Sequence, residues 1–232
     1  MSRFGFWHSA REPKIEYLGY VLRNNGSGSF SSQTFTGVGL GDPAEDREIF
    51  LLAGFRTSDA RTISSASIAG VSCTVESLTS SAAASLAQMA VLHARVPAGT
   101  SGDIAITLSG NVTALSAGVY RVEGRPVPGA GELQFISSSG GAGVTSAGFS
   151  GVNAPKDGFI LSGCMPGNVV SNLNISGCNL ALDERINMNS SGGAIYNAVS
   201  HSPILSSPLS SQSATWTWTS SSYRAAGLWV FS

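Results

Sequence analysis

Short runs of apolar or alternating residues recur along the whole chain, and glycine, serine, proline, asparagine and aspartate separate them. Runs of this length, with turn residues about every 8 to 12 positions, are typical of β-strands. The expected strands are 15–22, 30–38, 48–54, 62–68, 71–77, 88–96, 103–108, 118–122, 133–137, 145–152, 159–163, 173–176, 178–182, 194–200, 214–219 and 226–231. Only 81–89 has the composition of a short helical turn.

The two halves of the chain repeat each other. For example, Phe-Leu-Leu-Ala-Gly in the first half is matched by Phe-Ile-Leu-Ser-Gly in the second. The matching pairs are 35–38 with 149–152, 50–54 with 159–163, 71–75 with 177–180, 90–94 with 194–198, and 118–122 with 227–231. The spacing drifts by a few residues, as it does when loops change length between paired core strands. We infer the internal duplication of a β unit.

A chain of 232 residues is long enough for two units of about 100 to 110 residues, each with its own core. We therefore predict an all-β chain of two tandem β-sandwiches of jelly-roll or immunoglobulin-like type. An N-terminal arm (1–13) precedes the first sandwich (14–124). A linker rich in proline and glycine (125–131) leads to the second sandwich (132–232).

The clearest alternation is Thr-Trp-Thr-Trp-Thr at 215–219, which places Trp216 and Trp218 on one face of a strand. Such a pair could form a platform on which sugars stack. The corresponding strand of the first half carries Ile104 and Ile106 instead, and a shared inward face explains both halves. We predict that both tryptophans are buried.

Charged residues make up only 12% of the chain, and the formal net charge is −1. No run of Lys or Arg forms a basic stripe for a phosphate backbone, which argues against nucleic acid as a partner. The chain has no apolar stretch of about 18 residues that would cross a bilayer, nor the apolar core of a secretory signal. We expect a soluble protein that is made without export and not inserted into a membrane.

The sequence shows no convincing catalytic set. It has neither the nucleophile elbow nor the Ser-x-x-Lys pattern of serine enzymes, and its three histidines (His8, His93 and His201) fall in the arm, in a strand and near a loop. We interpret these histidines as ordinary surface or core residues. We therefore predict no enzymatic activity and no cofactor.

Asp42, Glu45 and Asp46 belong to the only acidic cluster, and their oxygens are candidate ligands for calcium. We favour a turn followed by the charged start of a strand, because the matching turn of the second half keeps only Asp157.

The three cysteines, Cys73, Cys164 and Cys178, cannot all pair within the chain and lack the spacing of a zinc site. We interpret them as buried free thiols. A disulfide between subunits is the alternative.

Four segments together suggest a family: Phe-Thr-Gly-Val-x-Leu-Gly-Asp-Pro-x-x-Asp-Arg-x-Ile from residue 35, Ala-Gly-Val-Ser-Cys-Thr at 69–74, Val-Pro-Ala-Gly-Thr-Ser-Gly at 96–102, and Gly-Val-Tyr at 118–120. Their pattern resembles a group of tailed-bacteriophage virion proteins of α-proteobacterial phages and prophages, over residues 33–232. The resemblance implies a structural part of the tail, fibre, neck or head surface. Its partners would be other virion proteins and copies of itself. By analogy with spikes and fibres, we expect the copies to form a trimer.

The arm carries three aromatic residues, Phe4, Phe6 and Trp7, which Arg3 and Arg11 flank. Aromatic residues and arginine are enriched where proteins bind one another. We predict that the arm docks on a neighbouring subunit; the alternative is a frayed terminus.

The rival function is a carbohydrate-binding module that uses exposed aromatic rings, with Tyr196, Tyr223 and Trp229 as candidates. A displayed fibre could combine both roles by binding glycan on the host surface.

Overall fold

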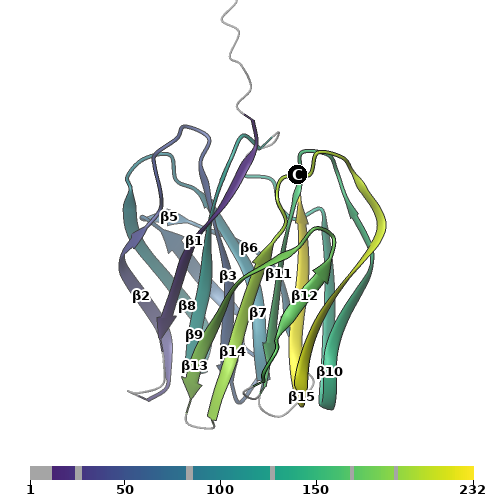
Figure 1. Ribbon diagram of the computed structural model, residues 1–232. Helices are drawn as coiled ribbons and strands as arrows, with labels where there is room; N and C mark the ends of the chain where they lie inside the picture. Colours follow the sequence, from purple (N-terminus) through teal and green to yellow (C-terminus); the bar gives the residue numbers. More distant parts are fainter. Residues whose placement is uncertain (1–11, 24–27, 82–85, 126–128, 168–169, 191–192) are drawn as a thin grey trace, which may run out of the picture.

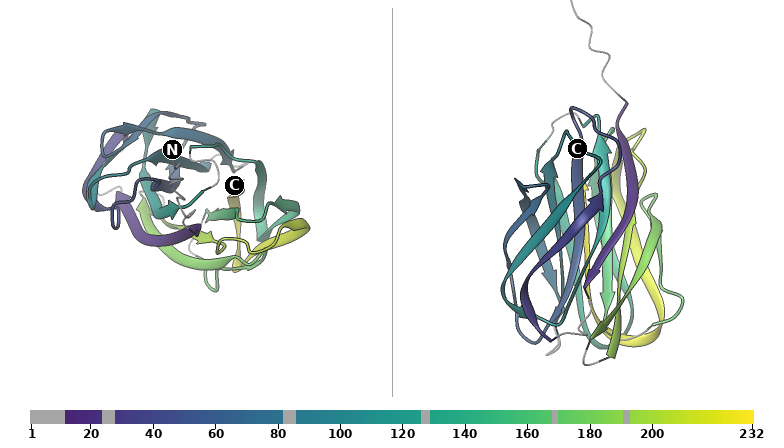
Figure 2. Two further views of the ribbon diagram at one scale, coloured as in Figure 1. Left: turned by 90° about the horizontal axis from the view of Figure 1, so that it is seen from above. Right: turned by 90° about the vertical axis from the view of Figure 1, so that its left-hand side faces the viewer.

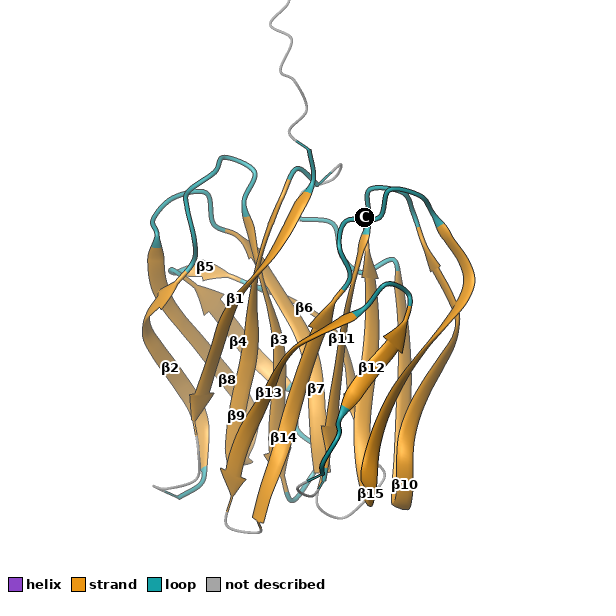
Figure 3. Cartoon of the chain, in the orientation of Figure 1, coloured by secondary structure: helices purple, strands orange, loops and turns teal. Residues whose placement is uncertain are grey.

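The chain is built from strands, as the computed structural model in Figures 1 and 3 shows. The structure describes residues 12–23, 28–81, 86–125, 129–167, 170–190 and 193–232, and these residues form no helix. None of the described residues therefore lies in a helix long and apolar enough to cross a membrane. The strands are β1 (Lys14–Arg23), β2 (Phe30–Gly39), β3 (Glu48–Thr57), β4 (Ile63–Ile68), β5 (Val71–Ser72), β6 (Thr74–Ser80), β7 (Leu86–Arg95), β8 (Ser101–Val112), β9 (Ala114–Glu123), β10 (Gln134–Ala154), β11 (Phe159–Pro166), β12 (Asn174–Gly177), β13 (Ala181–Ser190), β14 (Gly193–His201) and β15 (Leu209–Phe231).

The strands form three antiparallel sheets. Sheet A has the order β1-β9-β3-β7-β6, and sheet B has the order β2-β8-β4-β5. Sheet C has the order β10-β15-β11-β14-β13, with β12 added beside β15. Seen from above, the first half of the chain, with sheets A and B, lies beside the second half, with sheet C (Figure 2).

Two long strands, β10 and β15, give sheet C two layers. The C-terminal part of β15 pairs with β11, whereas its N-terminal part pairs with β12. Both parts also pair with β10, with shifts in register along the way. A hydrophobic core that includes Ile160, Trp216 and Leu228 lies between the layers.

Sheet A is covered on both faces, and the sequence of β3 explains why. Side chains of a strand alternate between the two faces of its sheet. In β3, Leu51 and Phe55 belong to the core between sheets A and B. Phe50 and Leu52 belong to a third core, which sheet A shares with sheet C. Because both faces are apolar, every residue of β3 is buried.

The all-β class predicted from the sequence is confirmed, and each predicted run overlaps at least one described strand. The runs 133–137 and 145–152 join into the single strand β10, and 214–219 and 226–231 join into β15. The predicted burial of Trp216 and Trp218 is also confirmed.

Two details of the prediction are wrong. Residues 86–89 belong to strand β7 and not to a helical turn; 82–85 lie outside the described residues. The strand predicted over 178–182 begins only at residue 181, because Cys178 and Asn179 have positive φ and belong to the preceding turn.

Candidate functional site

The predicted docking arm falls outside the part of the chain that the structure describes. This applies to all five residues assigned to it: Arg3, Phe4, Phe6, Trp7 and Arg11.

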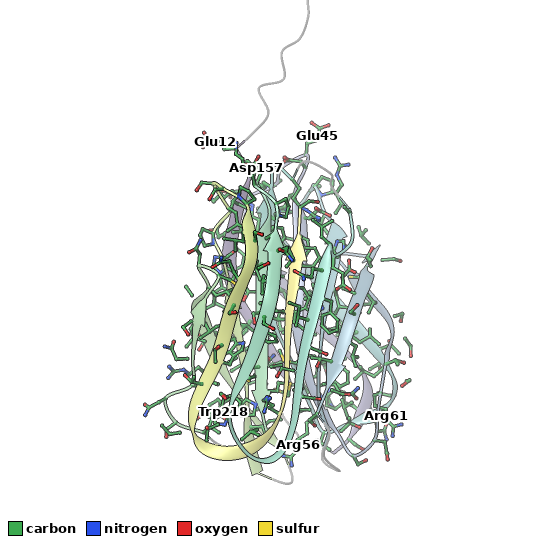
Figure 4. The ribbon with its side chains drawn as sticks, turned by 90° about the vertical axis from the view of Figure 1, so that its right-hand side faces the viewer. Glu12, Glu45, Arg56, Arg61, Asp157 and Trp218 are labelled. Atoms are coloured by element: carbon green, nitrogen blue, oxygen red, sulfur yellow. The ribbon has the colours of Figure 1, made fainter. Side chains whose placement is uncertain are left out.

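The acidic turn is held by hydrogen bonds. Asp42 and Glu45 are exposed, and Asp46 accepts a hydrogen bond of 2.8 Å from the backbone N–H of Gly124. Glu45 lies at the same end of the molecule as Asp157, opposite the end with Arg56 (Figure 4). Among the described residues, no group of three or more His, Cys, Asp or Glu side chains could hold a metal ion.

The aromatic residues considered for glycan binding differ in their surroundings. Trp229 is fully buried and donates a hydrogen bond of 2.9 Å from Nε1 to the carbonyl of Ser77, so the expectation that it is exposed is wrong. Tyr196 is half-buried against the core of sheet C. Tyr223 belongs to β15, but its side chain is outside the described part.

All three cysteines are free within the chain; Cys164 and Cys178 are buried, and Cys73 is half-buried. Burial raises the pKa of the Cys73 thiol to about 12, and it raises the pKa values of the other two thiols as well. The three thiols therefore stay protonated at neutral pH.

The most unusual chemistry lies where sheets A and C meet, because buried ionisable side chains interrupt an apolar core there. On β7, His93 stacks on Phe50 with ring centroids 4.7 Å apart. Its Nε2 lies 2.8 Å from Oε1 of Glu76, and its Nδ1 lies 3.6 Å from Oε1 of Glu48. Phe231 of sheet C covers the imidazole edge-on.

Arg125, at the start of the linker, completes this cluster. Its guanidinium donates to Glu48 at 2.7 Å, to the carbonyl of Ser232 at 2.7 Å and to that of Ala130 at 2.9 Å. The backbone N–H of Gly129 also donates to Glu48, at 2.7 Å. One buried carboxylate thus ties sheet A to the linker, and Arg125 ties the linker to the last residue of the chain.

A second cluster of the same kind lies elsewhere on this interface. Asp183 of β13 accepts hydrogen bonds from Nδ1 of His201, at 2.8 Å, and from the hydroxyl of Tyr120, at 2.9 Å. The rings of Tyr120 and His201 meet edge-on at 5.6 Å. Tyr17 packs on Tyr120, and its buried hydroxyl has no hydrogen-bond partner among the described residues.

The surroundings of these groups shift their pKa values. Burial alone would lower the pKa of His93, but the neighbouring carboxylates of Glu48 and Glu76 outweigh it and raise that pKa. Burial alone would raise the pKa of Glu48, but His93, Arg125 and the N–H of Gly129 outweigh it and lower that pKa. The first cluster therefore carries ionised groups in a buried place.

Sequence reasoning did not single out these two clusters. It assigned His93 and His201 to ordinary positions, and it did not connect Glu48 with Arg125. The available signal was a polar residue inside an apolar strand, since His93 follows three apolar residues on β7. Which carboxylate faces it depends on contacts between distant strands.

Comparison with known proteins assigns no family. No family model matches the chain, and no curated protein or solved structure has a significant match to it.

Proposed function

We propose that this chain is a structural component of a bacteriophage virion, made of two jelly-roll units that arose by internal duplication. It would assemble with other virion proteins and with copies of itself. The observation that carries the proposal is the strand order, which sheets A and C share, together with the virion-like sequence pattern.

The jelly-roll assignment rests on how consecutive strands alternate between sheets. In the first half, β1, β3, β7 and β9 belong to sheet A, whereas β2, β4, β5 and β8 belong to sheet B. Apart from β6, which adds a fifth strand at the edge of sheet A, this gives two four-stranded sheets connected in the pattern of a jelly roll, a fold found in capsid and lectin domains.

The duplication rests on matching places in two sheets. Sheet A reads β1-β9-β3-β7-β6 and sheet C reads β10-β15-β11-β14-β13, so each strand has a counterpart in the same position and chain order. The two ends of β10 would correspond to β1 and β2, and the two ends of β15 to β8 and β9.

A virion protein must keep its shape while many copies of it pack against one another. The three hydrophobic cores of the described residues suit this role, because closely packed protein interiors have low compressibility. The carbohydrate-binding alternative is less favoured, since Trp229, one of its three aromatic candidates, is buried.

Immunogold electron microscopy of purified phage particles tests the proposal, with an antibody against this chain and pre-immune serum as the control. Label at one defined place on the particle would support a structural role and locate it. Unlabelled particles, with the chain free in the lysate, would reject it. A glycan array on the purified chain should stay blank.

The docking of the arm needs a separate test. Deletion of residues 1–12 should abolish incorporation into particles while the chain still folds, as circular dichroism would show. Normal incorporation of the shortened chain would reject the docking role but leave the virion assignment standing.

A further inference from the structure

The carboxylates that pair with the two interface histidines both lie at β-bulges. The register of β6 against β7 shifts between Val75 and Leu78, and that of β13 against β14 shifts between Leu182 and Glu184. Glu76 and Asp183 lie within these shifts. A bulge re-aims a side chain that regular pleating would direct elsewhere, so both edge strands present an acid to a histidine of the next strand.

Each bulge also accepts a hydrogen bond from the opposite sheet. Trp229 of sheet C donates to the carbonyl of Ser77 in the bulge of β6, and Tyr120 of sheet A donates to Asp183 in the bulge of β13. The contact is reciprocal, as in an interface with two-fold symmetry. The bulge of β6 is therefore one place where a hydrogen bond joins sheet A to sheet C.

Charge balance at the β6 bulge depends on His93. Glu48 of β3 and Glu76 of β6 face it, and Arg125 of the linker faces Glu48. Sheet C contributes the uncharged ring of Phe231. With His93 protonated, the two positive and two negative charges of these four side chains cancel. After His93 loses its proton, Nε2–H still donates to Glu76, but the buried Glu48 and the half-buried Glu76 then share one cation, an arrangement that an interior site tolerates poorly.

Glu132 lies next to the same bulge. It accepts hydrogen bonds from the backbone N–H and the hydroxyl of Ser77. Because Ser77 directly follows Glu76, a displacement of Glu76 that overcomes these two bonds would also move the carbonyl that Trp229 binds.

We propose that the bulge of β6 is a pH-dependent clasp between sheets A and C, which the protonated His93 keeps closed and which releases Trp229 when His93 loses its proton. This inference goes beyond the proposed function and holds whether or not the chain is part of a particle.

The indole N–H groups provide the probe. That of Trp229 crosses the interface, whereas Trp216 donates to Ser162 at 3.0 Å and Trp218 to the carbonyl of Val144 at 3.1 Å, both within sheet C. Hydrogen exchange of the indoles in the full chain, followed by NMR from about pH 6 to about pH 10, spans the titration of a histidine with a raised pKa. The ratio of the Trp229 rate to the Trp216 rate removes the intrinsic base catalysis that all indoles share.

We expect this ratio to rise by up to about tenfold per pH unit once His93 titrates, which is the linkage for one proton. In Glu76→Gln, which removes one of the carboxylates that hold the proton, the rise should begin at lower pH. In Asp183→Asn, the matched change at the other cluster, the onset should not move.

Three results would overturn the clasp: a ratio that stays constant over the whole range, a rise that Trp216 and Trp218 follow together with Trp229, or an onset that Glu76→Gln leaves unchanged. The second result would mean that the whole molecule unfolds. Because the test rests on Glu76→Gln, it stands even if substitutions of His93 itself do not fold.

Discussion

Arg47 offers the sharpest test of how this fold is held together. Its side chain is fully buried, and the five N–H groups of its guanidinium face six backbone carbonyls at 2.7 to 3.2 Å, so two of the three carbonyls beside Nη1 share one N–H. Three of these carbonyls lie in the turn 40–42, and the others at residues 96, 98 and 99. The Asp-Arg pair that the sequence suggested as the charged start of a strand thus contains a clamp between two loops.

The cost of Arg47→Lys follows from the number of donors. A guanidinium has five N–H groups and an ammonium has three, so at least two carbonyls lose their partner. Each buried polar group left unpaired costs about 1 to 3 kcal/mol. Four of the six bonds are only partly buried, which favours the lower half of that range. We expect a loss of about 2 to 4 kcal/mol in the free energy of unfolding.

Urea denaturation, followed by circular dichroism and by tryptophan fluorescence, measures this loss. Arg95→Lys is the matched control, because Arg95 is exposed and, among the residues that the structure describes, its guanidinium donates only to the carbonyl of Glu45. The control should change stability by less than about 0.5 kcal/mol. If Arg47→Lys costs no more than Arg95→Lys, the clamp contributes nothing and the reasoning fails.

Three further predictions concern the cores. Gly54→Ala should cost about 1 to 3 kcal/mol in urea unfolding, since its Cβ would lie 2.8 Å from the buried amide carbon of Asn197, whereas Gly148→Ala, with open space around it, should cost under about 1 kcal/mol. The pKa of Glu48 is lowered in the folded chain, so its contribution to the free energy of unfolding is present above the ordinary pKa of 4.5 and is lost as the pH falls through the folded pKa. In Glu48→Gln, this part of the loss of stability in acid should be absent from urea unfolding measured at a series of pH values. The buried Cys164 should react with a thiol reagent only at the rate of unfolding, and rapid labelling of the native chain would contradict its burial.

The periodicity of the sequence predicted the strands well because most of them have one buried, apolar face. Trp216 and Trp218 are an example: threonine alternates with them, and both are buried. The uninterrupted apolar run of β3 also predicted a strand, yet it carries a further message. A strand that is apolar on both faces needs a sheet on each side, which is how sheet A lies between sheets B and C.

The repeat was harder to read at the level of single residues. Its pairing of 90–94 with 194–198 aligns His93 with Asn197. In the structure, Asn197 lies on the interface and donates to Ser116 of sheet A at 2.9 Å. His201 instead occupies the place beside the bulge of β13 that His93 occupies beside the bulge of β6. Each of the two bulges adds one residue to its edge strand, and periodicity alone does not reveal where such a residue lies.

The interface between sheets A and C needs both of its unusual ingredients. Small residues let the sheets approach closely; a Cβ on Gly118 would lie 3.0 Å from Val199 of sheet C. Apolar contact supplies most of the attraction but is not directional, so several alignments of two apolar sheet faces could bury similar areas. Only one alignment gives the hydroxyl of Tyr120 and the indole of Trp229 their acceptors. Because a buried polar group without a partner is costly, these bonds select that alignment, while the surrounding core provides its stability.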